Sequence, residues 1–279
     1  MDSATAIWLD GRPDAALPLP DRGLDFGDGL FETLLLRDGA PLFPEYHLAR
    51  LGEGLGRLGF PDCTARARQC LEQACADIAS RGWQACALRV TVTRGGGPRG
   101  YAPPEHARPR ILVTATRLER DCDTLLSPAC LVVSTVRWPT QPLLAGLKHL
   151  NRLEQVLASA ENRRQGVDES VMLDQEGWVI SAVAGNIFIV SEGQLRTPPL
   201  NHCGIAGTRR RLVLERWAPA IGLAVEEAEL DLADLLAAEE IFITNSLFGL
   251  RPVARLDDTG WIRHQTCRAL FQRYLEETT

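Results

Sequence analysis

Two groups of mixed strand-like and helix-like segments follow one another along this chain, and their order restricts the fold more than any other feature. The first group consists of a short strand before the Asp10–Gly11 turn, a β-rich run at Leu30–Leu36, helices from near Pro44 and over Thr64–Ser80, and strands at Ala87–Thr93 and Ile111–Ala115. The helix that begins near Pro44 has leucines at the spacing of one buried face. This mixture predicts an α+β domain over residues 1–116.

A polar, unpatterned segment at 117–128 predicts a connection between domains. The second group then begins, and we expect a second α+β domain over 129–279 that carries the lysine described below. Its expected elements are a strand at Cys130–Val136, a helix from about Lys148 to Gln165, a hairpin of ESVMLD and WVISAVAGNIFIV, a strand near Gln194–Arg196, helices at Thr208–Trp217, Asp231–Ala238 and His264–Glu276, and the strand EIFITN.

Composition excludes several classes of function. The formal net charge is −6 and no basic stretch is interleaved with aromatic residues, so nucleic acid is not an expected partner. No apolar run approaches the ~20 residues that span a bilayer, and no secretory signal is visible, so the expected location is the cytoplasm. The eight cysteines form no C-x-x-C pair, which favours reduced, mostly buried thiols. No His and carboxylate cluster has metal-ligand spacing, and no metal is expected.

Lysine usage is unusual in this chain. Among 30 basic residues, 29 are arginine and the one lysine is Lys148. Arginine supplies surface charge and phosphate contacts, but it does not become a neutral amine. Lysine can lose its proton, attack a carbonyl and form an imine. Lys148 is therefore a candidate for chemistry that requires an amine, although survival by chance remains open from composition alone.

The neighbours of Lys148 point to a family. KHLNRLEQVLA, DES-x-MLD and the N-I-F of AGNIFIV resemble the fold-type-IV pyridoxal 5′-phosphate (PLP) enzymes. These are the branched-chain aminotransferases, D-amino acid aminotransferases and 4-amino-4-deoxychorismate lyases. DRGLDFGDGLFET, HLAR, TRGGGPRGY, GIAGTRR and TNSLFGLRPV follow in the family's order and cover nearly the whole chain.

The resemblance implies a two-domain fold like that of D-amino acid aminotransferase, a homodimer and bound PLP. It assigns Lys148 as the Schiff-base and catalytic lysine, with Thr33 facing the cofactor. A dianionic phosphate needs a cation, hydroxyls and backbone N–H donors. The resemblance assigns this phosphate site to Arg50, Gly207, Thr208, the Arg209 backbone, Asn245 and Ser246.

One position departs from the family pattern. The family usually has a glutamate five residues before the Asn of N-[IL]-F, where it binds the protonated pyridine nitrogen of the cofactor; here that residue is Ser181. A serine can hydrogen-bond the ring, but it has no charge with which to keep the nitrogen protonated. We expect this change to be tolerable in a lyase, where aromatisation of the product drives the reaction, and costly in a transaminase.

Three motifs favour one branch of the family. TRGGGPRGY, LLAGLKHLNRLEQVLA and TNSLFGLRPV resemble the 4-amino-4-deoxychorismate lyases, which form p-aminobenzoate and pyruvate for folate synthesis. Arg94, Arg99 and Tyr101 lie in the first of these motifs and are candidates to contact the substrate's carboxyl groups. Two alternatives stay open: an aminotransferase acting on D-amino or branched-chain amino acids, and a PLP-binding protein with little catalysis.

Overall fold

The structure is a computed structural model that describes residues 4–278. The chain divides into two compact units: the N-terminal unit ends at Cys122 and also includes Leu147–Asn151, and the C-terminal unit takes the rest from Asp123. The boundary falls inside the expected connection at 117–128. The lysine segment differs from expectation, because Leu147–Asn151 groups with the N-terminal unit although we had placed Lys148 in the second domain.

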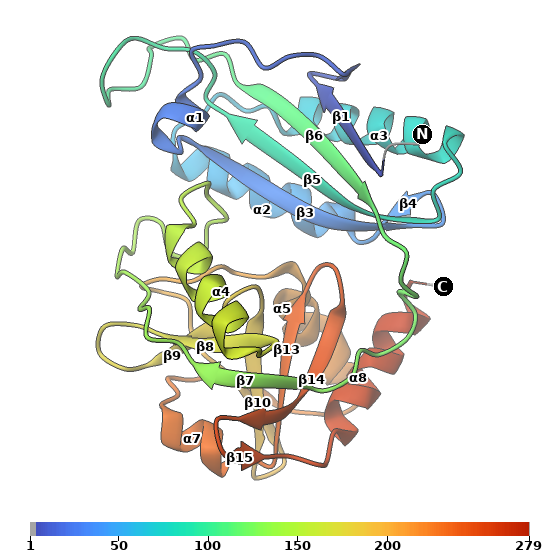
Figure 1. Ribbon diagram of the computed structural model, residues 1–279, viewed down its shortest axis with the longest axis vertical. Coiled ribbons are helices and arrows are strands. Elements are labelled where there is room, and N and C mark those ends of the chain that lie inside the picture. The colour runs from blue at the N-terminus through green and yellow to red at the C-terminus, as the bar shows by residue number, and fades with distance from the viewer. Residues whose placement is uncertain (1–3, 279) are drawn as a thin grey trace. The chain divides into compact units, whose positions relative to one another are not determined.

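The N-terminal unit is one antiparallel sheet covered by two helices. Its elements are β1 (Thr5–Leu9), β2 (Arg12–Pro13), α1 (Arg22–Phe26), β3 (Gly29–Arg37), β4 (Ala40–Pro41), α2 (Pro44–Arg57), α3 (Thr64–Ser80), β5 (Ala85–Thr93) and β6 (Arg110–Arg117). The strand order is β2-β1-β6-β5-β3-β4. Figure 1 shows α2 and α3 against the sheet, and α2 packs on β3 while α3 packs on β5 and β6.

The helices α2 and α3 form where their sequence patterns predicted them. Pro44 occupies the first turn of α2, where a missing N–H costs no hydrogen bond. Leu48, Leu51 and Leu55 are buried along one face of α2, so the leucine spacing did mark the side that meets the sheet.

The C-terminal unit is a mixed sheet with helices around it. Its elements are β7 (Ala129–Val133), α4 (Leu153–Gln165), β8 (Glu169–Leu173), β9 (Val179–Ala182), β10 (Asn186–Ser191), β11 (Gln194–Thr197), α5 (Thr208–Leu212), the π-helix η1 (Val213–Trp217), α6 (Ala218–Ala220), β12 (Val225–Glu227), α7 (Leu232–Ala237), β13 (Glu240–Asn245), β14 (Gly249–Leu256), β15 (Thr259–Gly260) and α8 (Gln265–Glu276). The strand order is β12-β11-β10-β13-β14-β7-β8-β9, and β15 pairs with β14.

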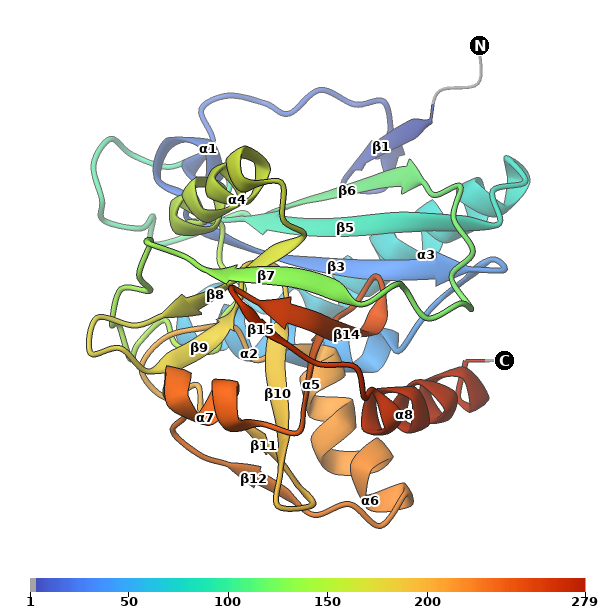
Figure 2. The same ribbon diagram turned by 60° about the horizontal axis from the view of Figure 1, so that its bottom comes forward.

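Three elements of this unit differ from the sequence expectation. Helix α4 begins at Leu153, so Lys148 lies outside it and outside the reach of its dipole, which acts only within the first turn. The run WVISAVAGNIFIV forms two strands, β9 and β10, interrupted at 183–185. The expected helix over Thr208–Trp217 continues through a π-helical turn, and Figure 2 shows α5 and α6 in one helical segment.

The expected α+β class is confirmed by this mixture of sheets and helices. Within residues 4–278, no helix is both long enough and apolar enough to cross a membrane. All eight cysteines are free thiols, and six of them are buried.

Candidate active site

The lysine segment pairs with the beginning of β3. The Phe31 amide donates to the Lys148 carbonyl (2.9 Å), and the Leu150 amide donates to the Gly29 carbonyl (3.0 Å). Residue 29 must be glycine, because a Cβ there would lie 2.5 Å from the Val92 carbonyl oxygen and 2.7 Å from Leu150 Cδ1. These backbone bonds explain why Leu147–Asn151 groups with the N-terminal unit rather than with α4.

Lys148 reaches the ring of Phe31. Its Nζ lies 4.3 Å from the ring centroid, and the guanidinium carbon of Arg89 lies 3.7 Å from the same centroid. Thr33 follows Phe31 by two residues on β3, so both side chains point to one face of the sheet, and Thr33 stands directly opposite Arg89 on β5. One face thus brings together Lys148, Thr33 and Arg89, the last of which the sequence reasoning did not single out.

Arg50 lies on the other face of β3, next to Glu32. Its Nε donates to Glu32 Oε1 (2.8 Å) and its Nη2 to Glu32 Oε2 (2.5 Å), while His47 Nδ1 lies 2.6 Å from Glu32 Oε2. Burial by itself would raise the pKa of Glu32, but the charge of Arg50 and hydrogen bonds from His47 and Arg50 outweigh it and lower that pKa to about 2. Glu32 is therefore a buried carboxylate that fixes the direction of Arg50.

The glycine-rich loop after β5 begins with a buried arginine. Arg94 Nε donates to both carboxylate oxygens of Asp28 (3.0 and 2.8 Å), its Nη1 and Nη2 donate to the carbonyls of Gly59 and Leu58 (3.0 and 2.8 Å), and its guanidinium lies 3.8 Å from the Phe60 ring centroid. These contacts hold the start of the loop in place. They give Arg94 a structural role, and its expected contact with the substrate stays a prediction.

The same loop is also held by Arg22. Its Nη1 donates to the Gly100 carbonyl (2.9 Å) and its Nη2 to the Tyr101 carbonyl (2.8 Å). The Tyr101 side chain is 86% exposed, with its ring 5.4 Å from that of Phe26, and Arg99 is also exposed. Arg99 and Tyr101 are therefore exposed side chains on a loop whose backbone is held by Arg22.

In the C-terminal unit, a tight turn leads into α5. Asn186 Nδ2 donates to the Ile205 carbonyl (2.9 Å), which holds the Asn186 side chain against the turn. A Cβ on residue 207 would lie 2.0 Å from Asn186 Oδ1, so only glycine fits at position 207. Gly207 is the N-cap of α5, and no side chain among the described residues caps this helix start. Thr208 and Arg209 stand at this helix start, where an α-helix directs its first N–H groups outward.

A second loop adjoins this helix start. Arg209 is buried, and its Nη2 donates to the Ser246 carbonyl (3.3 Å), which ties the turn to the end of β13. Asn245 Oδ1 accepts from the amides of Leu247 and Phe248 (2.9 and 3.0 Å). The Asn245 side chain therefore shapes the loop that contains Ser246.

The turn is also paired with the chain just before the lysine. Gly146 donates to the Gly204 carbonyl (3.0 Å) and accepts from the Ala206 amide (3.0 Å). Gly146 needs its glycine here, because its φ is +80°, a conformation that L side chains rarely adopt. Lys148 follows Gly146 by two residues in the sequence.

Ser181 on β9 is buried and accepts a hydrogen bond from Trp138. The indole Nε1 donates to Ser181 Oγ at 3.0 Å. The sequence identified Ser181 by its position before the N-I-F motif, but it gave no sign of Trp138, which lies more than forty residues earlier in the chain, at 138. Only the fold brings this pair together.

The residues of the C-terminal unit fit the phosphate of the cofactor that the sequence implies. The start of α5 at Thr208 and Arg209 lies beside the Ser246 loop, to which the Arg209 side chain is bonded, so residues with N–H and hydroxyl groups come together at one turn. Such a set suits a dianion. The amine that the same cofactor requires is Lys148, placed beside Phe31 in the N-terminal unit.

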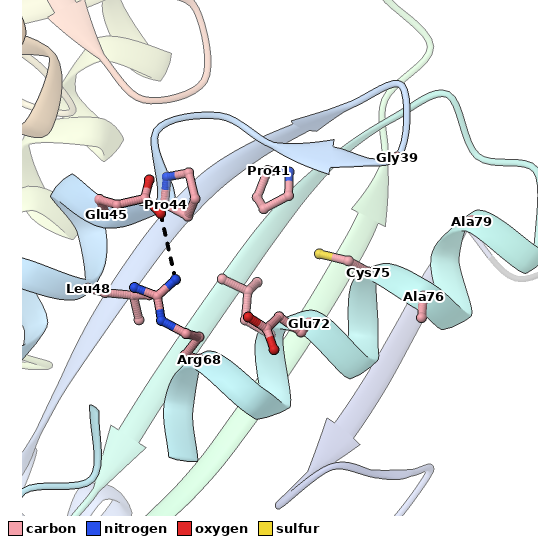
Figure 3. Close-up of a pocket in the computed structure, with 11 residues that line it drawn as sticks. Gly39, Pro41, Pro44, Glu45, Leu48, Arg68, Glu72, Cys75, Ala76 and Ala79 are labelled. Carbon is pink, nitrogen blue, oxygen red and sulfur yellow. Dashed lines mark ion pairs between the residues drawn. The ribbon is translucent and has the colours of Figure 1, made fainter. Parts of the chain in front are cut away.

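A hollow of about 490 Å³ lies elsewhere in the N-terminal unit, among α2, α3 and the turn between β3 and β4. Figure 3 shows its lining, in which Arg68 pairs with Glu45 at 3.6 Å beside Leu48 and the sulfur of Cys75. It contains none of the candidate residues. This hollow is therefore not part of the candidate active site.

Comparison with known proteins identifies the family. The model of the amino-transferase class IV family matches residues 29–256, most of the chain. The chain belongs to the class IV aminotransferase family. This result confirms the family named from the lysine motif, and it agrees with the strands and helices described above.

Known members of the class IV aminotransferase family are similar to this chain over most of its length. An aminodeoxychorismate lyase of Vibrio harveyi is 35% identical, covering 89% of this chain and 90% of its own length. A putative branched-chain-amino-acid aminotransferase of Methanocaldococcus jannaschii is 32% identical, covering 90% and 88%. The crystal structure of 4-amino-4-deoxychorismate lyase from Pseudomonas aeruginosa is 43% identical, with a TM-score of 0.88 over 97% of this chain and 98% of that one.

Proposed function

We propose that this protein is a PLP-dependent lyase that converts 4-amino-4-deoxychorismate into p-aminobenzoate and pyruvate. The observation that carries the proposal is the position of Lys148, the one lysine of the chain, with its amine 4.3 Å from the Phe31 ring centroid on the face that also holds Thr33. The similarity to two lyases at 35% and 43% identity supports the choice of reaction.

Lys148 has two tasks in this proposal: it holds the cofactor covalently, and its freed amine takes the C4 proton of the substrate. The bound cofactor supplies an electron sink at the substrate nitrogen. The electron pair left at C4 forms a ring double bond as the C3–O bond breaks. The departing enolpyruvate takes up a proton and becomes pyruvate, and the ring becomes aromatic. Thr33 lies on the same face and assists the transfer of the proton.

The phosphate is assigned to the turn and loop of the C-terminal unit. Gly207, Thr208 and the Arg209 amide supply N–H and hydroxyl donors, and Ser246 adds its own. Asn245 supports this set by shaping the Ser246 loop. Gly146 connects the set to Lys148, because its backbone pairs with the turn two residues before the lysine.

Two further assignments complete the binding residues. Arg50 is the cation of the phosphate site, held in one orientation by Glu32. Ser181 contacts the pyridine nitrogen of the cofactor. These assignments follow the family resemblance, and each can be tested by substituting the residue.

The substrate carries two carboxyl groups, so it needs cations near the amine. Arg99 and Tyr101, exposed on the glycine-rich loop, are the candidates that the sequence supplied. Arg89 is a further candidate, because its guanidinium and the Lys148 amine both contact the Phe31 ring. A guanidinium binds a carboxylate in a bidentate manner, which fixes the orientation of the substrate.

We also infer that the protein works as a homodimer in the cytoplasm. Helix α4 exposes Leu153 (74%), Val156 (60%) and Leu157 (58%) at the spacing of one helix face. Between them, the amide atoms of Gln155 are buried without a partner among the described residues. An apolar stripe of this kind is typical of a surface that a second copy covers. Mass measured in solution by light scattering tests the dimer, and Leu157→Glu should shift it toward monomer.

An aminotransferase is the second candidate function, because the relative from Methanocaldococcus jannaschii is named as one. The two reactions differ in what an amino donor does. An aminotransferase converts its bound cofactor to the amine form when a D-amino or branched-chain amino acid is added, whereas the lyase needs no such exchange. A binding-only protein would show bound cofactor and no turnover with either class of substrate.

Trapping tests the cofactor assignment directly. Borohydride should fix PLP to the protein, and mass spectrometry should find the added mass on the peptide that contains Lys148. Lys148→Arg keeps the positive charge but cannot form an imine, so it is the matched control and should carry no added mass. Added mass on another peptide, or none on the wild type, would reject Lys148 as the attachment site.

A further inference from the structure

Ser181 and Trp138 form an isolated polar pair inside an apolar cluster. Both side chains are buried, and the indole N–H of Trp138 donates to Ser181 Oγ at 3.0 Å. A hydroxyl has one hydrogen to donate and two lone pairs that accept. Within the described part of the chain, the Ser181 hydroxyl donates to no acceptor. Its hydrogen is thus available to a ligand.

A β-bulge determines the direction of Ser181. Leu173 pairs with Val179 and Met172 pairs with Ser181, so Ile180 is an extra residue in β9. In a regular register, Ser181 would stand opposite Val171, which belongs to the main core cluster of this unit. The bulge turns Ser181 instead toward the side of Met172, where Trp138 lies.

The same side carries the turn assigned to the phosphate. The apolar cluster around Trp138 includes Cys203 and Ile205, and a Cβ on Gly204 would lie 2.9 Å from the Cγ2 of Ile180. Ile180 is the residue next to Ser181 on the bulge. Ser181 and the phosphate-binding turn therefore belong to one packed cluster.

Among the described residues, Asp174 and Glu169 lie beside this cluster, and backbone amides hold both carboxylates in place. Asp174 accepts from the amides of Glu176 and Trp178 (3.1 and 2.8 Å) at the hairpin turn. Glu169 accepts from the amides of Val183 and Ala184 (3.0 and 3.4 Å).

A cation adjoins the Trp138 ring. The guanidinium carbon of Arg152 lies 5.6 Å from the Trp138 ring centroid. A positive ring near this arginine would be disfavoured by like charge, in surroundings where burial already penalises an unbalanced charge.

We propose that Trp138 is a positioning residue that makes Ser181 a hydrogen-bond donor, so that the cofactor's pyridine nitrogen is held neutral and accepts. This inference rests on the proposed PLP function and names the protonation state that this chain selects. With a neutral nitrogen, Ser181 accepts from Trp138 and donates to the ring, and every polar group is satisfied. With a protonated nitrogen, Ser181 would accept twice and its own buried hydrogen would have no acceptor.

The test is the ¹⁵N chemical shift of the ring nitrogen in protein loaded with ¹⁵N-labelled PLP. The expected value for the wild type is that of an unprotonated pyridine. Ser181→Glu should move the shift to the protonated range. Trp138→Phe keeps the aromatic volume but removes the donor, so the shift should move and the dissociation constant of PLP should rise about fivefold, the size of one neutral hydrogen bond.

Trp178→Phe, a substitution of a partly exposed tryptophan on the β8–β9 turn, is the matched control and should change neither reading. A protonated nitrogen in the wild type would overturn the inference, as would a Trp138→Phe protein with unchanged shift and affinity. If Trp138→Phe does not fold, the wild-type shift alone decides. Failure of the wild type to attach PLP at Lys148 would instead reject the proposed function, so the two failures are distinguishable.

Discussion

Arg50 and Glu32 form a bidentate ion pair, with Nε–Oε1 at 2.8 Å and Nη2–Oε2 at 2.5 Å. The HLAR motif alone does not indicate how the Arg50 side chain is oriented. The pair explains how the arginine is oriented: β3 supplies the carboxylate and α2 the guanidinium, so the packing of one helix on one strand fixes both.

Removing the charge of Glu32 should destabilise the protein strongly. Glu32→Gln removes the buried carboxylate that pairs with the half-buried guanidinium of Arg50, which costs about 3 kcal/mol of unfolding free energy. Denaturant unfolding measures the change. Glu53→Gln on the same helix breaks only the exposed pair with Arg57 (3.8 Å) and should cost less than about 0.5 kcal/mol. Equal losses in both variants would contradict the structural role given to Glu32.

Gly207→Ala should disturb the turn before α5. The added Cβ would lie 2.0 Å from Asn186 Oδ1, so the turn must shift and the dissociation constant of PLP should rise at least about tenfold, the effect of ~1.4 kcal/mol. Equilibrium titration with PLP measures it. Gly56→Ala is the control, because no atom lies within 4 Å of its Cβ and alanine favours a helix. PLP affinity that is unchanged in Gly207→Ala would argue against the turn as the phosphate site.

Glu169 should make stability depend on pH near neutrality. Burial raises the pKa of Glu169 to about 7. Hydrogen bonds from the amides of Ala184 and Val183 lower this pKa, but burial has the larger effect. The folded state therefore binds a proton that the unfolded state releases, and stability is lost as pH rises through 7. Because Glu169 keeps partial contact with solvent, we expect a loss of about 1 kcal/mol between pH 5 and 8. Glu169→Gln should remove this slope from the unfolding free energy, and a slope of the same size in both proteins would refute the assignment.

Substitutions of Arg94 and Arg99 should affect different properties, the first the stability of the protein and the second its binding of substrate. Arg94→Ala removes one of the two arginines that pair with the half-buried Asp28 carboxylate, the other being Arg22. It also removes two hydrogen bonds to the carbonyls of Gly59 and Leu58, so it should lower the unfolding free energy by about 3 kcal/mol. Arg99→Ala, which changes an exposed side chain, should leave stability within about 0.5 kcal/mol and raise KM for the substrate. Thermal unfolding and steady-state kinetics together check the pair. A raised KM with intact stability in Arg94→Ala would return Arg94 to the substrate site.

Sequence patterns predicted the elements that are governed by local periodicity. The leucine spacing of α2 marked its buried face, and the position of Pro44 marked its start. The family motifs, which cover most of the chain, led to the fold class and to the family. The sequence predicts a helix from Lys148, because KHLNRLEQVLA has a helical pattern throughout. In the structure α4 begins at Leu153, because Lys148 and Leu150 form backbone hydrogen bonds with β3.

The groups that surround the candidate site could not be predicted in the same way. Trp138 reaches Ser181, and Arg89 reaches Phe31, through strand register and a bulge, which depend on contacts between distant segments. Arg94 looked like a substrate residue from its motif, yet its partners Asp28 and Leu58 come from elsewhere in the chain. Periodicity carries no information about such pairs.

The most direct test of the central claim is product release from 4-amino-4-deoxychorismate by the PLP-loaded protein. The account predicts pyruvate and p-aminobenzoate in equal amounts, with both lost in Lys148→Ala. Intact covalent attachment of PLP at Lys148 without pyruvate would contradict the lyase function. Conversion of the bound cofactor to its amine form by D-amino or branched-chain amino acids would then identify an aminotransferase.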